Sequence, residues 1–352
     1  AYLGTYVAGA ATVPPAAPSV AVEYYHAAFQ HYFVTAIPQE IVVLDSAGYG
    51  AFTIDRSVSV IAPPGLYAGV SVFAPFAGIT VDAPGAKVAL RGLSINGQGG
   101  SPGIWMLNGA ELHVEGCVVS GLVNGIVIEA GSTSVKDTIV RDNSQSGVKV
   151  YDGAVTAHFD HVRVQNNAFF GILFQQTNAG VRGSISNSVV TDNGGAGIQV
   201  SLFGPAFDVI DIDSTEISSN GWVSVEPGVD VYVSDPNAKA EVSVANSLIA
   251  RNRGGGVFTY MAAAGEAHVS VTDSTVTGNY GHGLVTTGAL GGTLIASRNT
   301  ITRNEAAGLR NNGGTLYTTQ DNRVQGNLGG ATSGTTPPPP GTGRRPPPLP
   351  PA

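Results

Sequence analysis

The chain has 352 residues, of which only 12% are charged, and its formal net charge is −8 at neutral pH. A globular α/β enzyme carries roughly twice that share of charged residues, so the polar surface here must come from Ser, Thr, Asn and Gln. The acidic balance, with no Lys/Arg cluster before the C-terminal tail, argues against nucleic acid as a partner. No apolar run is long enough to span a membrane.

Two features of the sequence bear on the cellular compartment. Cys117 is the only cysteine, so the chain cannot form an internal disulfide. No neighbouring motif marks it as a nucleophile, and we expect a small buried side chain. The chain starts at Ala1 without a Met, which fits a mature product after removal of a signal peptide. We therefore expect an extracellular or cell-surface protein.

The N-terminal part is expected to precede the main fold. Residues 1–21 contain a short strand, Leu3–Val7, and an Ala/Pro linker, and residues 22–39 contain the most aromatic stretch of the chain. That stretch forms either a helix with its aromatic residues on one face or a hairpin of Val22–Tyr25 and Tyr32–Thr35. It resembles a small module of secreted bacterial proteins. We expect it to cap one end of the array that follows.

From about residue 135 onward, one short sequence motif recurs, and an asparagine is its invariant position. The anchors are Asn143, Asn167, Asn193, Asn220, Asn252, Asn279, Asn304 and Asn327. The spacing between them varies from 23 to 32 residues, and a Gly follows most anchors by four residues. A constant phrase with spacers of variable length is typical of a solenoid, in which each repeat is one turn.

When the repeats are aligned on their anchor asparagines, the residues at equivalent positions predict β-strands. Three residues before successive anchors stand β-branched residues, such as Val140, Val164 and Val190, and neighbouring columns are polar. Period-2 alternation of this kind predicts short parallel strands that stack from coil to coil around one apolar core. The predicted fold class is therefore all-β: a parallel β-helix of about 10–12 coils over residues 40–330.

We expect the anchor asparagines to form a ladder at a bend, because each side-chain amide can bond the same amide one coil away. The glycine after each anchor is expected to supply a backbone with positive φ. Two coils are irregular. The coil around Leu112–Ile128 lacks an anchor, and the coil at Asn220 carries about four extra residues within Trp222–Glu226.

Three stretches, Glu40–Asp45, Leu90–Gly97 and Leu112–Val118, resemble those of bacterial right-handed parallel β-helix proteins of the pectate-lyase-like superfamily. The resemblance implies right-handed coils of three short sheets in an exported protein, over residues 40–330. It implies little about activity, because most such relatives have none assigned. Residues 331–352 form a proline-rich tail, which we expect to be extended polyproline II.

The catalytic and metal-binding motifs of β-helix proteins are absent or poorly matched. Gly281–Gly283 resembles the Gly-His-Gly motif of polygalacturonases, but His282 occupies a variable letter of the repeat and the other motifs of that family are missing. The Arg motif of pectate lyases is absent. The calcium-binding nonapeptide of secreted toxins would require Asp where this chain has Gln199. We expect no bound metal and no cofactor.

The strongest candidate for chemistry is a group of carboxylates around one strand: Asp208, Asp211, Asp213 and Glu216. Asp211 and Asp213 flank an apolar residue and should point outward from the same face. His158 and Asp160 occupy the matching columns two coils earlier, which places Asp160 roughly 9.6 Å from Asp213. That separation is at the upper edge of the range for inverting glycoside hydrolysis. A solvated ladder of polar side chains explains the same pattern.

Two functions are compatible with these patterns. The leading hypothesis is a secreted scaffold for adhesion, glycan contact or self-assembly. Its partners would be an extracellular polysaccharide or further copies joined through the N-terminal strand or the solenoid ends. The alternative is a polysaccharide lyase or glycoside hydrolase that uses His158, Asp160, Asp211 and Asp213. A groove over that face, walled by residues 202–207 and 222–228, would favour an enzyme. The aromatic candidates for stacking on sugars are Trp105, Phe203, Phe207, Trp222 and Tyr232.

Overall fold

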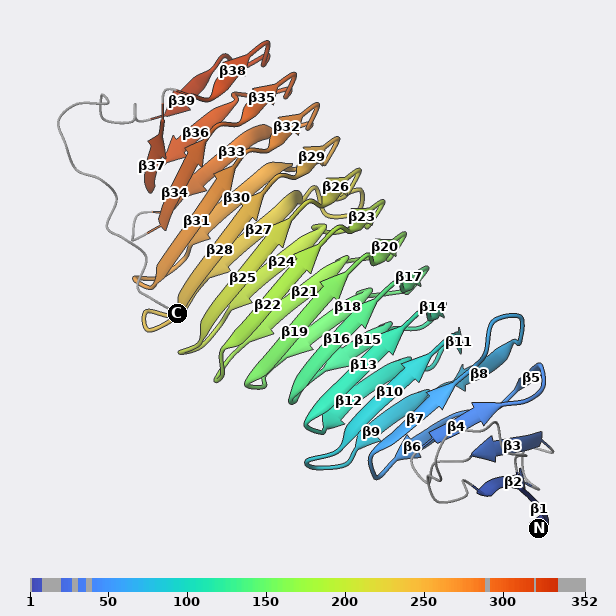
Figure 1. The fold of residues 1–352 in the computed structure, drawn as a ribbon. Helices are drawn as coiled ribbons and strands as arrows, with labels where there is room; N and C mark the ends of the chain where they lie inside the picture. The colour runs from blue at the N-terminus through green and yellow to red at the C-terminus, as the bar shows by residue number, and fades with distance from the viewer. Residues whose placement is uncertain are drawn as a thin grey trace, which may run out of the picture.

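A computed structural model gives the structure of residues 40–288, 292–319 and 321–334, and the backbone of residues 2–7, 20–26 and 31–35. These residues form 39 β-strands and no helix. From β4 onward, successive strands belong in turn to three parallel sheets, which we call A, B and C, so the chain winds into a long β-helix (Figure 1). Sheets B and C have twelve strands each, which gives about eleven complete turns. The predicted fold class is confirmed.

Each sheet takes one strand from every coil. Sheet A consists of β1 (Tyr2–Val7), β2 (Val20–His26), β3 (His31–Thr35), β4 (Glu40–Val43), β7 (Val58–Ile61), β10 (Lys87–Arg91), β13 (Glu111–Glu115), β16 (Ser132–Lys136), β19 (Val155–Asp160), β22 (Val181–Ser186), β25 (Phe207–Asp213), β28 (Lys239–Ala245), β31 (Glu266–Thr272), β34 (Gly292–Ser297) and β37 (Thr315–Thr318). Sheet B consists of β5 (Ala47–Gly48), β8 (Ala68–Phe73), β11 (Leu93–Gln98), β14 (Val118–Ser120), β17 (Ile139–Arg141), β20 (Arg163–Gln165), β23 (Val189–Thr191), β26 (Glu216–Ser218), β29 (Leu248–Ala250), β32 (Thr275–Thr277), β35 (Thr300–Thr302) and β38 (Arg323–Gln325). Sheet C consists of β6 (Phe52–Ile54), β9 (Ile79–Asp82), β12 (Ile104–Asn108), β15 (Ile126–Ile128), β18 (Val148–Tyr151), β21 (Ile172–Gln176), β24 (Ile198–Leu202), β27 (Pro227–Val233), β30 (Gly255–Met261), β33 (His282–Thr287), β36 (Leu309–Asn312) and β39 (Thr332–Gly334).

The first three strands lie at the N-terminal end of the β-helix (Figure 1). β1 pairs with β2, β2 with β3, and β3 with the edge of β4, all antiparallel. Of the two alternatives for the aromatic stretch, the hairpin is therefore the correct one. At the other end, β39 extends the last coil beyond residue 330, the predicted boundary of the β-helix. The predicted polyproline II conformation concerns residues outside the described part, which ends at 334.

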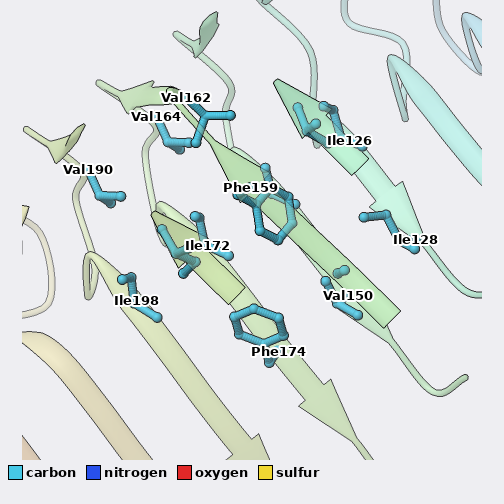
Figure 2. Close-up of a cluster of buried hydrophobic side chains, with 14 of the residues drawn as sticks. Ile126, Ile128, Val150, Phe159, Val162, Val164, Ile172, Phe174, Val190 and Ile198 are labelled. Carbon is cyan, nitrogen blue, oxygen red and sulfur yellow. The ribbon is translucent and has the colours of Figure 1, made fainter. Parts of the chain in front are cut away.

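The apolar core runs along the inside of the coils. Figure 2 shows one section of it, in which Ile172 and Ile198 stack on successive strands of sheet C and Ile126 lies in the same column two strands before Ile172, with Val148 between them in register. Two phenylalanines from different sheets, Phe159 and Phe174, meet edge to face with ring centroids 6.4 Å apart. β-branched residues suit such stacks because their side chains fit between neighbouring parallel strands.

Cys117 is buried in the same core, as predicted. Its Sγ lies 3.5 Å from the carbonyl oxygen of Glu115 and 3.6 Å from that of Leu90. Burial raises the pKa of this thiol to about 11. The thiolate that a nucleophile requires is therefore suppressed at neutral pH.

The anchor asparagines form the predicted ladder inside the solenoid. All eight side chains are at most 8% exposed. Nδ2 and the backbone N of Asn167 both donate to Oδ1 of Asn193, at 2.8 and 3.1 Å, and Nδ2 of Asn193 also donates to the carbonyl of Val164. In the coil without an anchor, the backbone N of Leu122 donates to Asn143. The ladder satisfies polar groups that would otherwise be buried without partners.

The glycines after the anchors differ from the prediction. Gly147 and Gly171 do not have positive φ, whereas the residues directly before anchors do, as at Asp142 (57°) and Asp192 (56°). A Cβ on Gly171 would lie 2.5 Å from the carbonyl oxygen of Gly197 in the next coil. The prediction of positive φ at these glycines is therefore wrong. They are required because neighbouring coils approach too closely for a side chain.

Candidate functional site

The four residues of the predicted catalytic face do lie together on the outside of sheet A. Asp160 on β19 pairs through Ser186 on β22 with Asp213 on β25, and His158 stands in the adjacent column with Asp211. Asp211 is exposed and Asp213 half-buried, so both point outward as expected. Two strand spacings separate each matched pair, which is the predicted alignment.

The surroundings of Asp160 do not suit an acid catalyst. Its carboxylate accepts hydrogen bonds from Asn187 Nδ2 (2.9 Å) and Ser186 Oγ (3.0 Å), and lies 3.0 Å from Nδ1 of His161. The hydrogen bonds from Asn187 and His161 lower its pKa to about 2. A general acid must hold a proton near the working pH, and this carboxylate is ionised far below that.

Asp208 belongs to the core and not to the predicted group. Its side chain is fully buried at the start of β25, where one carboxylate oxygen accepts from the backbone N of Val181 at 2.9 Å. The second oxygen has no hydrogen-bond partner. Burial raises the pKa of Asp208 to about 7.

A groove is present on another part of the surface, where sheet B turns into sheet C. It encloses about 720 Å³ and crosses six successive coils, from the end of β11 to the end of β26. At about 4.8 Å per strand, its length is roughly 24 Å. Its lining residues are Gly99, Gly121, Leu122, Asp142, Asn143, Ser144, Asn166, Asn167, Ala168, Asp192, Gly194, Trp222 and Val223. Residues 202–207 and 222–228 were expected to wall a groove over the face of sheet A that carries Asp160 and Asp213; of these, residues 222–223 line this groove between sheets B and C instead.

The insertion 222–226 folds back over the preceding coil. The backbone N of Val223 donates to the carbonyl of Gly194 at 2.8 Å, and the backbone N of Ala196 donates to Glu226 Oε2 at 2.8 Å. A Cβ on Gly194 would lie 2.8 Å from Val223 Cγ2 and closer still to backbone. The small residues after the anchor in this coil therefore leave room for the insertion.

Trp222 closes the C-terminal end of the groove. Its side chain is 46% exposed. The Arg253 guanidinium lies 5.1 Å from its ring, and Tyr280 meets it nearly edge-on at 6.0 Å. Because these contacts come from the two following coils, the ring is held in place by regular parts of the solenoid. Such pre-organisation lowers the entropy lost when a ligand binds.

Aromatic residues also stand at the N-terminal end of the groove. Phe73 and Phe76 are 60% and 65% exposed, and Phe73 forms a bridge with Gly99, a lining residue. Large exposed apolar side chains that gather at the ends of a polar groove are a feature of binding surfaces.

The polar lining of the groove is acidic or neutral. Asp142, Asn166 and Asp192 each precede a ladder asparagine, and their left-handed backbone turns the side chain outward while the ladder residue points inward. Asn166 Nδ2 donates to Asp142, whose carboxylate also pairs with Arg141 at 3.2 Å. No Lys, Arg or His lines the groove.

These groove residues were not singled out from the sequence. Asp142, Asn166 and Asp192 occupy the position directly before the anchor asparagine. The same position is Gly278 in one repeat and Arg303 in another. The signal that could have revealed them is the polar residue at this position in five consecutive coils, of which the first three carry Asp or Asn and the next two are Ser219 and Arg251. Their significance depends on the insertion that ends the groove.

His282 is held by its neighbours. Its Nδ1 accepts from the backbone N of Ala307 at 3.0 Å, and its Nε2 lies 2.7 Å from Arg310 Nη1. Burial, and then the charge of Arg310, lower the pKa of this imidazole. Within the described residues, no group of three or more His, Cys, Asp or Glu side chains could hold a metal ion. No helix that could cross a membrane occurs in that part of the chain either.

Comparisons with known proteins identify the family and the structures that this chain resembles. The family model for the right-handed β-helix region matches residues 42–184 and 177–336. No curated protein sequence matches the chain. Among solved structures, a mutant of the periplasmic alginate epimerase AlgG is similar, with a TM-score of 0.55 and 12% identity over 86% of this chain and 83% of that one.

Two further structures are similar at the level of the fold. The A-module of the mannuronan C-5 epimerase AlgE4 from Azotobacter vinelandii has a TM-score of 0.52 and 15% identity, over 84% of this chain and 88% of that one. The catalytic domain of a GH87 α-1,3-glucanase in complex with tetrasaccharides has a TM-score of 0.53 and 10% identity, over 85% of this chain and 64% of that one. The family model covers most of the sequence, and the chain therefore belongs to the right-handed β-helix family.

Proposed function

We propose that this protein is an exported or surface-exposed β-helix scaffold that binds an extracellular polysaccharide in the groove between sheets B and C. The groove itself carries the proposal: it encloses about 720 Å³, has the polar side chains of Asp142, Asn166 and Asp192 in its middle coils, and has exposed aromatic side chains at both ends. Its length of roughly 24 Å suits an extended polymer. Sugar rings can stack on Trp222, and their hydroxyls can donate to the carboxylates of Asp142 and Asp192.

The charge of the lining favours an uncharged glycan. Asp142 and Asp192 line the groove, and Asp142 pairs with Arg141 whereas Asp192 has no ion pair among the described residues, so an acidic polymer would meet like charge at Asp192. The structural neighbours support a glycan in general terms. The α-1,3-glucanase was solved with bound tetrasaccharides, and a glucan is uncharged, whereas the two epimerases have the acidic polymers alginate and mannuronan in their names. We therefore favour a neutral polysaccharide.

A glycan array followed by titration of the best neutral oligosaccharide tests this function. Trp222→Ala should weaken binding about two- to tenfold, because aromatic stacking contributes about 0.5–1.5 kcal/mol beyond the buried area. Tyr317→Ala is the matched control, since Tyr317 is 52% exposed and lies on sheet A, away from the groove. Equal affinities of wild type and Trp222→Ala would overturn the assignment of the groove.

A carbohydrate-active enzyme is the second candidate, as a polysaccharide lyase or glycoside hydrolase acting on an extracellular glycan. The alignment of His158 and Asp160 with Asp211 and Asp213 favours it, because a separation of roughly 9.6 Å is near the range for inverting hydrolysis. Assays for reducing ends and unsaturated products over neutral and acidic glycans test the activity. Turnover that survives in Asp160→Ala and Asp213→Ala would exclude this face.

Self-assembly is compatible with the scaffold role. β1 is the last strand of sheet A at the N-terminal end, and one of its edges has no partner strand in the described chain. The last coil, β37–β39, ends the three sheets at the other end. Strand edges of this kind can pair with further copies. We propose these two ends as the contacts of any homo-assembly.

A further inference from the structure

A row of aromatic side chains stands on the outer face of sheet C. Tyr232 on β27 is in register with Tyr260 on β30, and their rings stack with centroids 5.5 Å apart and planes 13° from parallel. Phe203, directly after β24, lies 5.6 Å from the Tyr232 ring. We call these three residues the aromatic row. Phe203 and Tyr260 are 48% and 41% exposed, so the row is open to solvent at both ends.

The two faces of the Tyr260 ring have different surroundings. The Tyr232 ring covers the face that is turned toward the N-terminal coils. On the other side, the residues in register are Thr287 on β33 and then Asn312 on β36. These two short side chains contact each other, with Asn312 Nδ2 donating to Thr287 Oγ1 at 3.3 Å. The Tyr260 ring therefore has a free face toward the C-terminal end of the solenoid, with no large side chain in register before it.

The described part of the chain ends in register with the aromatic row. Gly334, the last residue of β39, pairs with Asn311 on β36. Asn311 pairs with Thr286 on β33, and Thr286 pairs with Thr259 on β30. Thr259 directly precedes Tyr260, so the chain reaches residue 334 one position before the register of the row. Three strand spacings, about 14 Å, separate this point from Tyr260.

The segment that follows, residues 335–352, has the composition and the reach to contact Tyr260. Its first proline run is Pro337–Pro340. A polyproline II chain rises about 3.1 Å per residue, so about five residues beyond Gly334 cover the distance to Tyr260, which falls at Pro339. Proline-rich segments bind surfaces lined by aromatic rings because their extended conformation is already formed and little entropy is lost.

The charges on the two sides are complementary. Residues 335–352 contain Arg344 and Arg345 and no acidic residue, whereas the net charge of the chain is −8. On sheet C, Asp152 directly follows β18 and Asp235 lies two residues after β27. Both carboxylates therefore lie at the ends of strands where the aromatic row also stands. The basic part of the segment is attracted to this edge of the sheet.

We propose that the aromatic row binds this chain's own segment 335–352, with prolines of the run Pro337–Pro340 packed against the free face of Tyr260. The bound segment crosses β36 and β33 over the short side chains of Asn312 and Thr287. It adds contacts to the last coils, where the three sheets end. The row shares no residue with the groove between sheets B and C, so this proposal is independent of glycan binding.

Electron paramagnetic resonance of the full chain tests the proposal, with a nitroxide label on the variant Thr342→Cys. The native Cys117 is buried and its thiol pKa is raised to about 11, so the introduced cysteine is labelled selectively. Residue 342 lies two positions after the proline run. The label should therefore move several-fold more slowly than on a free segment. The slow fraction should stay constant on dilution, because the contact is within one chain.

Two sets of variants should release the label. Tyr260→Ala removes the aromatic face, and Pro338→Ser combined with Pro339→Ser removes the prolines without changing the solenoid. Tyr317→Ala is the matched control, because Tyr317 is 52% exposed and lies on sheet A. A thermal melt should show each variant folded. Equal label mobility in the parent, Tyr260→Ala and the proline variant overturns the proposal. A slow fraction that disappears on dilution also overturns it, since the occupant is then a second copy.

Discussion

Glycine at the position four residues after a ladder asparagine is fixed by the distance between coils. Gly171 shows the geometry: a Cβ there would meet the carbonyl oxygen of Gly197 at 2.5 Å, Val190 Cγ1 at 2.6 Å and Asn193 Nδ2 at 2.9 Å. All three neighbours are buried and belong to one coil. They cannot move without disturbing the ladder, so the site has no room for relaxation.

Gly171→Ala is therefore expected to destabilise the fold by about 1–3 kcal/mol, the usual range for overpacking a dense core. Gly48→Ala is the matched control, because a Cβ on Gly48 has no atom within 4 Å and its φ is not positive. Urea unfolding followed by circular dichroism measures both. Similar midpoints for the two variants would contradict the argument from coil spacing.

Asp208 is the residue at which burial and charge conflict. One of its oxygens accepts from Val181 and the other has no partner, inside a side chain that is fully buried. The folded protein therefore prefers the protonated acid, and its pKa is raised to about 7. The unfolded chain releases this proton near its ordinary pKa of about 3.9.

The sign of the pH effect follows from the raised pKa. The folded state binds more protons than the unfolded state between about pH 4 and pH 7, so the Asp208 contribution to stability falls as pH rises through that window. Asp208→Asn should remove this dependence and raise the free energy of unfolding at pH 8 by roughly 1–3 kcal/mol, with little gain at pH 4. Urea unfolding across this pH range is the measurement. A variant that is less stable than wild type at pH 8 would refute the prediction.

At the scale of elements, the two irregular segments explain where the surface differs from a plain solenoid. The insertion 222–226 lies over Gly194 and ends the groove with Trp222. The hairpin of β2 and β3 continues sheet A beyond β4 in the antiparallel sense. Both segments rest on backbone hydrogen bonds to a regular coil, so their positions depend on the repeat.

Removal of residues 1–39 tests the role that we propose for the hairpin as a cap. The edge of β4 that pairs with β3 would become free, and exposed parallel-sheet edges promote association. The shortened chain should form larger species in light scattering as its concentration increases. Removal of residues 1–19 alone keeps β2 and β3 and should have a smaller effect. Monomers from the chain that begins at Glu40 would count against a capping role.

At the scale of the whole molecule, identical environments repeat along one axis. About eleven turns stack one core and one asparagine ladder from end to end, which gives a rod more than 50 Å long, at about 4.8 Å per coil. The formal net charge of the chain is −8, and two of its carboxylates, those of Asp142 and Asp192, line the groove. Such a surface repels polyanions at long range and leaves neutral polymers unaffected.

Salt dependence separates these two classes of ligand. Affinity for a neutral oligosaccharide should change by less than about twofold between about 0.05 and 0.5 M NaCl, because an uncharged ligand forms no ion pair with the protein. Titration at several salt concentrations measures this. A steep loss of affinity with added salt would show that charge drives binding, and would contradict the assignment of a neutral glycan.

The sequence by itself determined the features that recur. Eight asparagine anchors, the β-branched columns and the apolar-polar alternation demand the same environment in every coil, and the β-helix satisfies all of them at once. The outward placement of Asp211 and Asp213 followed from the same alternation. A pattern repeated this often has few alternative folds, and so the fold and the ladder could be predicted.

Only the tertiary structure decided the features that occur in a single coil and are not repeated along the solenoid. The groove depends on how the insertion that contains Trp222 folds over a glycine of the preceding coil. The inward position of Asp208 reflects its place at the start of β25, beside the corner of the solenoid. Such sites arise from contacts between coils, and no repeat in the sequence encodes them.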